Sequence, residues 1–217
     1  MTTASTVTTR FPAGGTELEG DLRLPRNAHG VVIFAHGTGS SRHSPRNRRV
    51  ADELGRRGLG TLLIDLLTHE EEVRDAHARD LRFDIGLLAD RVIGLVDWLT
   101  GQEDSRTLPI GLFGASTGAA AALVAAAARP EDVHAVVSRG GRPDLAGPAL
   151  IQVTAPTLLV VGEKDLPVVE INEQARNAMT VAAELRIIPG ATHLFEEPGT
   201  LDAVAEEAGT WFAAHLR

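Results

Sequence analysis

Hydrophobic and polar positions alternate in one rhythm at the start of this chain and in another rhythm after residue 24. Thr6–Phe11 and Thr16–Leu24 alternate with a period of two, and the turn Pro12-Ala13-Gly14-Gly15 separates them. Alternation on both sides of a glycine-containing turn predicts an antiparallel hairpin. We expect this hairpin to form an edge of a sheet.

Short apolar runs alternate with segments of helical spacing through the rest of the chain. The spacing is clearest in Leu81–Leu99, where apolar residues recur every three or four positions. The predicted strands are Gly30–Ala35, Leu59–Leu67, Leu108–Phe113, Val133–Ser138, Thr157–Gly162 and Glu184–Ile188. The predicted helices are Pro45–Arg57, Leu81–Leu99, Ala119–Arg129, Leu145–Ile151, Val168–Thr180 and Thr200–Arg217. Alternating strands and helices predict an α/β fold, with a mostly parallel central sheet covered by helices on both faces.

The stretch Thr68–Arg82 departs from this pattern because it is polar and has no sustained apolar face. We interpret it as an excursion of the chain at the edge of the sheet, too short for a cap domain. A chain of 217 residues suits a single domain, here residues 1–217. We therefore expect a cap-less domain with an open, shallow site.

Composition narrows the classes of protein that this chain can belong to. Hydrophobic residues make up 43% and charged residues 23%, and no apolar run approaches the roughly 18 residues of a membrane helix. Met1–Arg10 has neither a basic start nor an apolar centre, so it does not resemble a signal peptide. The expectation is a cytoplasmic protein with no membrane partner.

The absence of cysteine and the excess of acidic residues argue against thiol chemistry and nucleic-acid binding. Without cysteine, disulfides, thiolate metal sites and a cysteine nucleophile are impossible. The net charge of −8 and the pI near 5.5 are opposite to the basic surface of most nucleic-acid-binding proteins. We predict no nucleic-acid partner.

One short motif stands where a predicted strand meets a predicted helix. Gly114-Ala115-Ser116-Thr117-Gly118 follows Leu108–Phe113 and precedes the alanine-rich run from Ala119. A Gly-x-Ser-x-Gly in this context is typical of a nucleophile elbow, where the serine adopts strained backbone geometry and the glycines let strand and helix approach closely. Ser116 is the candidate nucleophile.

The ends of four predicted strands carry the other candidate residues. Ligands of open parallel sheets bind beyond the carboxyl ends of the strands. The loops at these ends are His36-Gly37-Thr38-Gly39-Ser40-Ser41, the Ser116 motif, Gly162-Glu163-Lys164-Asp165 and Pro189-Gly190-Ala191-Thr192-His193. The order of a serine, an acid and a histidine along the chain matches the nucleophile-elbow enzymes.

A serine hydroxyl needs a base, and the base needs a carboxylate to orient it. His193 is the predicted base, because imidazole titrates near neutral pH. Asp165 is the preferred carboxylate. Glu163 in the same turn and Asp144 after the preceding strand are its rivals.

Attack of a serine on a carbonyl creates an oxyanion that backbone amides can stabilise. The predicted donors are the amide of Thr117, directly after the nucleophile, and that of Thr38 in the first loop, with Gly37 as the less favoured choice. The same glycine-rich loop could be a plain turn or could hold a phosphate. No Walker lysine or dinucleotide glycine pattern accompanies it, so nucleotide binding is disfavoured.

Three arginines lie close to these strand ends in the sequence. Arg42 follows the first loop, and Arg139 and Arg142 follow the strand next to Ser116. They could bind a carboxylate of the substrate. The alternative is that they pair with local acids such as Asp52 or Asp144.

These motifs resemble the alpha/beta-hydrolase superfamily, and within it the small, cap-less dienelactone-hydrolase-like branch. The resemblance spans nearly the whole chain and rests on the His36–Ser41 loop, the Ser116 motif, Asp165 and Gly190-Ala191-Thr192-His193-Leu194-Phe195. It implies hydrolysis of an ester, lactone or thioester through an acyl-serine intermediate, with water as second substrate and without a cofactor. Members similar to dienelactone hydrolase itself use cysteine as nucleophile, whereas this chain has serine at that position and no cysteine, which argues against dienelactone as its substrate.

The leading prediction is a serine carboxylesterase with the triad Ser116, His193 and Asp165, which needs no cofactor and no metal ion. Its expected partners are a small ester substrate and water. One alternative is acyl transfer by the same triad, with an alcohol or thiol in place of water. The other is a ligand-binding protein that keeps the fold and has lost the chemistry.

Overall fold

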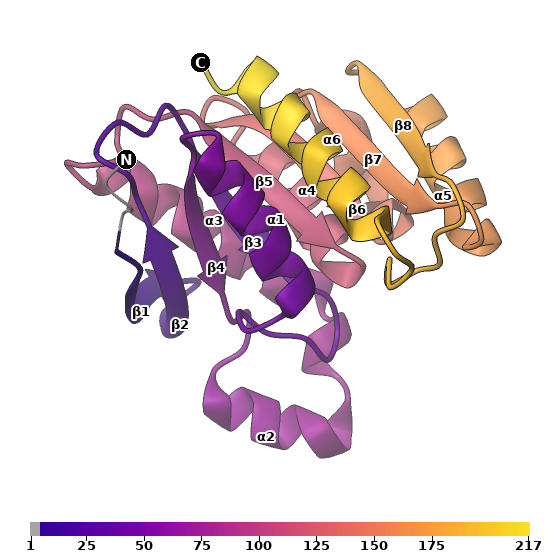
Figure 1. The fold of residues 1–217 in the computed structure, drawn as a ribbon. Coiled ribbons are helices and arrows are strands. Elements are labelled where there is room, and N and C mark those ends of the chain that lie inside the picture. Colours follow the sequence, from indigo (N-terminus) through magenta and orange to yellow (C-terminus); the bar gives the residue numbers. More distant parts are fainter. Residues whose placement is uncertain (1–4) are drawn as a thin grey trace.

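An eight-stranded sheet forms the centre of the computed structural model, which describes residues 5–217 (Figure 1). The strands lie in the order β1-β2-β4-β3-β5-β6-β7-β8. Their bounds are β1 Val7–Ala13, β2 Thr16–Arg23, β3 Val31–Ala35, β4 Gly60–Ile64, β5 Ile110–Ala115, β6 Val133–Arg139, β7 Thr157–Gly162 and β8 Ala183–Ile188. β2 pairs antiparallel with β1 and with β4, and every other neighbouring pair is parallel. The predicted α/β class and the antiparallel edge hairpin are confirmed.

Helices cover both faces of the sheet (Figure 1). On one face lie α1 (Pro45–Arg56) and α6 (Thr200–His215), and on the other lie α3 (Ile85–Gly101), α4 (Thr117–Ala128) and α5 (Leu166–Ala178). Each face has its own buried cluster, because successive strand side chains point to opposite sides. Ile33 belongs to the cluster under α3 and α4, and its neighbour Phe34 to the cluster under α1 and α6.

The polar excursion Thr68–Arg82, for which no helix was predicted, contains one. α2 (His69–Ala78) lies beyond the carboxyl end of β4, apart from the two helical layers (Figure 1). Thr68 and Glu71 form a capping box: the Thr68 hydroxyl accepts from the Glu71 amide, and the Glu71 carboxylate accepts from the Thr68 amide. This reciprocal cap initiates a helix without an apolar face. The signal Thr-x-x-Glu was visible in the sequence and was overlooked.

Two further elements differ from the expected ones. The predicted helix Leu81–Leu99 is divided into a 3₁₀ turn, η1 (Leu81–Phe83), and α3, because the Asp84 side chain caps the Leu87 amide and starts the helix there. The predicted helix Leu145–Ile151 is a 3₁₀ segment, η2 (Pro143–Gln152), interrupted at Gly147 with φ of 54°. The other predicted elements differ from the observed ones only at their ends.

Two further expectations concern the N-terminal segment and the absence of a membrane helix. Residues 1–4, part of the segment Met1–Arg10 that we interpreted as unlike a signal peptide, lie outside the described residues. Among residues 5–217, no helix has both the length and the apolar character that a membrane crossing requires.

Candidate active site

Ser116 occupies the turn between β5 and α4 in a conformation that few residues other than glycine adopt. Its φ is 51° and its ψ is −121°, a sparsely populated region that costs of order 1–3 kcal/mol. Two backbone hydrogen bonds hold it there: the Ser116 amide donates to the Arg139 carbonyl at 3.2 Å, and the Arg142 amide donates to the Ser116 carbonyl at 3.1 Å. The elbow is therefore fixed by the segment that follows β6.

The two glycines of the motif are required by close packing. A Cβ on Gly114 would overlap the backbone of Ala119, and a Cβ on Gly118 would overlap the carbonyl of Ala35. α4 can approach the sheet this closely because most of its buried residues are alanine. A third glycine, Gly37, lies so near the elbow that its Cβ would come within 2.9 Å of the Ser116 Cβ.

His193 and Asp165 come together at the ends of neighbouring strands β8 and β7. His193 Nδ1 lies 2.6 Å from Asp165 Oδ2. Because a carboxylate only accepts, Nδ1 carries the proton of the neutral ring and Nε2 is left as the acceptor. The Asp165 side chain is 15% exposed and that of His193 is 40% exposed, so the imidazole is the accessible member of the pair.

The rival carboxylates make other contacts. Glu163 Oε2 accepts from the Gly190 amide at 2.7 Å and so ties the start of the His193 loop to the end of β7. Asp144 forms a two-bond pair with Arg142, at 2.9 and 2.7 Å, and this guanidinium lowers the pKa of the Asp144 carboxyl. Neither acid is hydrogen-bonded to His193 among residues 5–217.

Ser116 and His193 both lie against the short segment Arg139–Gly140. The Ser116 amide binds the Arg139 carbonyl, and a Cβ on Gly140 would lie 3.4 Å from His193 Cε1. Gly140 has φ of 51°, a conformation that favours glycine. The described residues show no hydrogen bond between the Ser116 hydroxyl and the ring; in free enzymes such bonds often form only when substrate binds.

The two predicted oxyanion donors differ in their surroundings. Thr117 is the first residue of α4, where a helix has no internal acceptor for the amide. The Thr38 amide instead donates to the Thr117 hydroxyl at 3.0 Å, and the two threonine hydroxyls lie 2.9 Å apart. The Thr38 donor is thus occupied by a side chain in this state, which the sequence did not reveal.

His36 connects this loop to the segment after β4 through its two ring nitrogens. It is 9% exposed, its Nδ1 lies 2.9 Å from the Gly37 carbonyl, and its Nε2 lies 3.1 Å from the Leu66 amide. An amide only donates, so Nε2 accepts and the proton is on Nδ1. Burial lowers the pKa of His36, because a charged ring would be poorly solvated and Nε2 could no longer accept.

This arrangement predicts a pH-dependent contribution to stability. The unfolded chain binds a proton at His36 as the pH falls below about 6.5, whereas the folded protein resists protonation. The free energy of unfolding should therefore fall from pH 7.5 to pH 5.5. Urea denaturation of His36→Gln should show lower stability at pH 7.5 and a smaller loss at pH 5.5 than wild type. The exposed His134 provides the control: His134→Gln should keep the wild-type slope, and equal slopes in all three proteins would contradict the role of His36.

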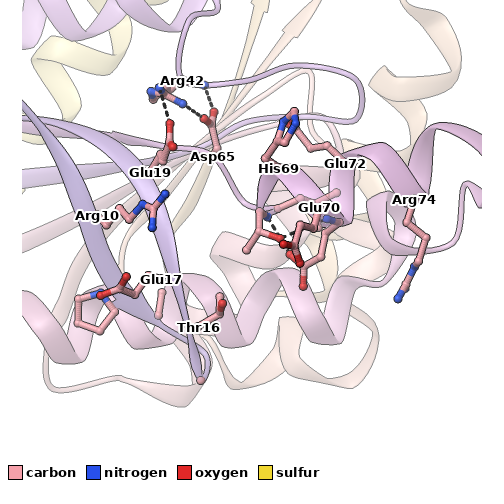
Figure 2. Close-up of a pocket in the computed structure, with 16 residues that line it drawn as sticks. Arg10, Thr16, Glu17, Glu19, Arg42, Asp65, His69, Glu70, Glu72 and Arg74 are labelled. Carbon is pink, nitrogen blue, oxygen red and sulfur yellow. Dashed lines mark hydrogen bonds and ion pairs between the residues drawn. The ribbon is translucent and has the colours of Figure 1, made fainter.

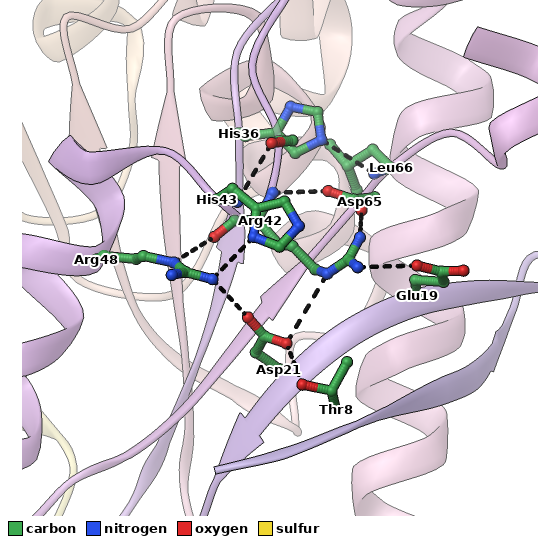
Figure 3. A network of polar contacts seen from close by, with 10 residues as sticks. Thr8, Glu19, Asp21, His36, Arg42, His43, Arg48, Asp65 and Leu66 are labelled. Carbon is green, nitrogen blue, oxygen red and sulfur yellow. Dashed lines mark hydrogen bonds and ion pairs between the residues drawn. The ribbon is translucent and has the colours of Figure 1, made fainter. Parts of the chain in front are cut away.

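Arg42 is not free to bind a substrate, contrary to our hypothesis. It pairs with Asp65 and, at 2.8 Å, with Glu19, while Asp21 lies 3.8 Å away (Figure 3). Its amide also donates to Asp65 at 2.6 Å. These carboxylates from β2 and from the end of β4 neutralise the charge of the guanidinium, so Arg42 joins the edge strands to the first loop.

Arg142 is likewise paired, through its two bonds to Asp144. The alternative of local pairing is confirmed for Arg142. For Arg42 the expected acid is wrong: Arg42 pairs with Asp65 and Glu19, whereas Asp52 lies 3.6 Å from Arg23. Arg139 differs, because its side chain is buried and no acid partner is found among the described residues.

Two cavities lie near the first loop. The larger, about 1230 Å³, opens between the hairpin and α2; Glu17 and Glu19 lie on one side and Glu70 and Glu72 on the other (Figure 2). Neither Ser116 nor His193 lines it. The smaller, about 200 Å³, lies beside the elbow. Its lining comprises His36, Gly37, Thr38, Gly39, Leu66, Leu67, Glu72, Asp75, Arg82, Leu88 and Thr117. The excursion that carries α2 thus contributes a wall of this cavity.

Comparisons with known proteins identify the family and the fold of this chain. The sequence model of the dienelactone hydrolase family matches residues 18–214. A crystal structure of dienelactone hydrolase from Anabaena variabilis has 57% identity, full coverage of both chains and a TM-score of 0.97. Est1E from Butyrivibrio proteoclasticus shares 17% identity over 95% of this chain and 98% of its own, with a TM-score of 0.79, which establishes a common fold.

Curated relatives of this chain are longer proteins. Two sequences from Mycobacterium tuberculosis named "Putative phosphoribosyl transferase" are 55% identical over 204 residues, which is 94% of this chain and 45% of theirs. The chain therefore spans less than half the length of these relatives, and their name describes the longer proteins. The match of the family over nearly the whole chain and the full-length similarity to a dienelactone hydrolase lead to one conclusion: this chain belongs to the dienelactone hydrolase family and has the alpha/beta-hydrolase fold.

Proposed function

We propose that the protein hydrolyses small carboxylic esters through an acyl-serine intermediate, with Ser116, His193 and Asp165 as the triad. The observation that carries the proposal is the 2.6 Å bond between His193 Nδ1 and Asp165 Oδ2. This bond directs Nε2 away from Asp165 as an acceptor, and the Arg139–Gly140 segment brings the ring beside the elbow. Lactones and thioesters contain the same acyl centre.

The proposed reaction has two halves, formation and hydrolysis of an acyl-serine. His193 Nε2 takes the proton of the Ser116 hydroxyl while its oxygen attacks the ester carbonyl, and Asp165 stabilises the imidazolium. The imidazolium then protonates the leaving alcohol, the acyl group stays on Ser116, and water activated by His193 releases the acid. The Thr117 amide is the first donor to the oxyanion. The Thr38 amide is the second donor. It reaches the oxyanion either by breaking its hydrogen bond to the Thr117 hydroxyl or by donating to both oxygens at once.

The small cavity is the proposed acyl pocket. It adjoins Thr117 and Gly37 at the elbow, and Leu66, Leu67 and Leu88 form its apolar wall. At about 30 Å³ per water molecule, 200 Å³ corresponds to the volume of roughly six or seven waters. The pocket therefore suits short or compact acyl groups, and the polar residues of the α2 region limit its length.

We expect kcat/KM for p-nitrophenyl esters to be highest for acyl chains of about two to four carbons and to fall for longer ones. Leu88→Ala should move the optimum to longer chains because it deepens the pocket. Leu95→Ala on the same helix, buried but outside the cavity, should destabilise the protein by about 2–5 kcal/mol without changing the chain-length profile. A profile that is flat in wild type, or unchanged in Leu88→Ala, would contradict this pocket assignment.

A further inference from the structure

Arg139 is a buried cation beside the proposed nucleophile. It ends β6 and is 8% exposed. Its Nε and Nη1 atoms are buried and have no hydrogen-bond partner in the described part of the chain. Its third nitrogen, Nη2, is not among these buried atoms and makes no hydrogen bond within residues 5–217, so it is the atom that reaches the surface. Burying an unpaired charge is unfavourable. A bound anion would therefore stabilise this guanidinium.

The nearest charges do not supply that anion. Burial, and after it the positive charge of Arg46, lower the pKa of Arg139 to about 10. Arg46, at the start of α1, is 3.6 Å from Glu196, while its own Nε is buried without a partner. Two cations and one carboxylate leave a net charge of +1. This balance fits a monoanion such as a carboxylate.

The position of Arg139 relative to the triad indicates which half of an ester carries the anion. Its neighbour Gly140 packs against the His193 ring, and His193 must protonate the leaving oxygen. The proposed acyl pocket lies instead with Thr38 and Thr117, next to the other side of the elbow. Arg46, whose charge acts on Arg139, pairs with Glu196 in the loop that carries His193. We therefore place Arg139 on the His193 side of the elbow, where the leaving alcohol must lie.

We propose that Arg139, assisted by Arg46, binds a carboxylate on the alcohol half of the substrate, so that the preferred substrates are small acyl esters of hydroxy acids. This inference rests on the proposed roles of Ser116 and His193. It replaces the earlier hypothesis of three substrate-binding arginines, because Arg42 and Arg142 are already paired.

The test compares two esters that differ in the charge of the leaving group. They are 4-acetoxybenzoate, which releases an anionic phenol, and 4-acetoxybenzamide, which releases a neutral phenol of similar shape. Wild type should prefer the benzoate in kcat/KM. Arg139→Met, which keeps the length of the side chain and removes its charge, should lower the ratio of the two kcat/KM values by about ten- to a hundredfold, the value of a charge-assisted hydrogen bond.

A control variant and a second substrate pair sharpen the result. Arg142→Met lies in the same segment and should leave the ratio unchanged. Mono(4-nitrophenyl) succinate and 4-nitrophenyl butanoate place the charge on the acyl half, and Arg139→Met should leave their ratio unchanged. A loss confined to the succinate would overturn the assignment to the alcohol half, and an unchanged benzoate ratio would overturn the site.

Thermal unfolding separates this inference from the proposed function. In wild type, 4-hydroxybenzoate should raise the Tm and 4-hydroxybenzamide should not; Arg139→Met should abolish the shift. Without ligand, Arg139→Met should be at least as stable as wild type, because an unpaired buried charge has been removed. A marked drop in its Tm would show a structural role and overturn the proposal. Failure to hydrolyse either ester would refute the esterase function, and the Tm shift would still decide the carboxylate site.

Discussion

Replacing Ser116 by alanine is expected to lower kcat for p-nitrophenyl acetate by at least about 10⁴-fold, because no covalent intermediate can then form. The Thr117 and Thr38 amides and the small cavity remain, so KM should change far less than kcat. The variant should also fold, since alanine removes only the hydroxyl, although the strained φ of 51° remains. Steady-state rates, corrected for the spontaneous hydrolysis of the ester, measure the loss.

Ser138 offers a matched control for this substitution. It lies at the end of β6, next to β5, and is fully buried; its hydroxyl has no hydrogen-bond partner in residues 5–217. Ser138→Ala should therefore keep near-normal turnover and stability. Normal turnover in Ser116→Ala would refute the mechanism, whereas equal losses in both variants would point to a general defect of the sheet edge.

The second large effect is expected from Asp165→Asn, a decrease of about 10⁴-fold in kcat. An asparagine amide can donate to His193 Nδ1, which would place the ring proton on Nε2, the atom that must accept from Ser116. The imidazolium would also lose its counter-charge. The kcat of the purified variant on p-nitrophenyl acetate, with circular dichroism to confirm folding, measures this effect.

Glu163→Gln is the appropriate comparison because Glu163 is in the same turn and binds the Gly190 amide instead of the imidazole. Its glutamine oxygen can still accept that bond, so we expect a loss below about tenfold. If the two variants lost activity in the reverse order, Glu163 would be the orienting carboxylate and the assignment of Asp165 would be wrong.

The sequence predicted the fold because its signals are local. Periods of two and of three to four residues identify strands and helices, and Gly114 and Gly118 are explained by close packing around a single turn. The order of serine, acid and histidine adds a global constraint. With strands parallel, the loops after β5, β7 and β8 must meet at one edge of the sheet, and there Asp165 and His193 are in contact.

The pairing of the arginines could not be predicted in the same way. Arg42 binds Asp65 and Glu19, each 23 positions away in the sequence, because β2 lies next to β4 in the sheet. Sequence reasoning considered nearby acids and therefore proposed Asp52. Arg139 is only five positions from Asp144 in the sequence, yet it has no acid partner within residues 5–217, since β6 turns its side chain into the interior.

The contacts of the first loop, His36–Ser41, also could not be predicted from the sequence. The bond from the Thr38 amide to the Thr117 hydroxyl joins residues 79 positions apart. It depends on how closely two loops approach each other, and the hydrophobic periodicity of the sequence does not encode that distance. The wall that α2 adds to the small cavity depends in the same way on a capped helix with one buried residue, Asp75, which pairs with Arg82.

Covalent labelling tests the central claim, that His193 activates the Ser116 hydroxyl, most directly. Wild-type protein treated with a fluorophosphonate should gain the mass of one adduct, and peptide mapping should locate it on Ser116. His193→Ala should label far more slowly under the same conditions, while its Tm stays near that of wild type. An adduct on another residue, or labelling of Ser116 at the same rate without the imidazole, would contradict the account.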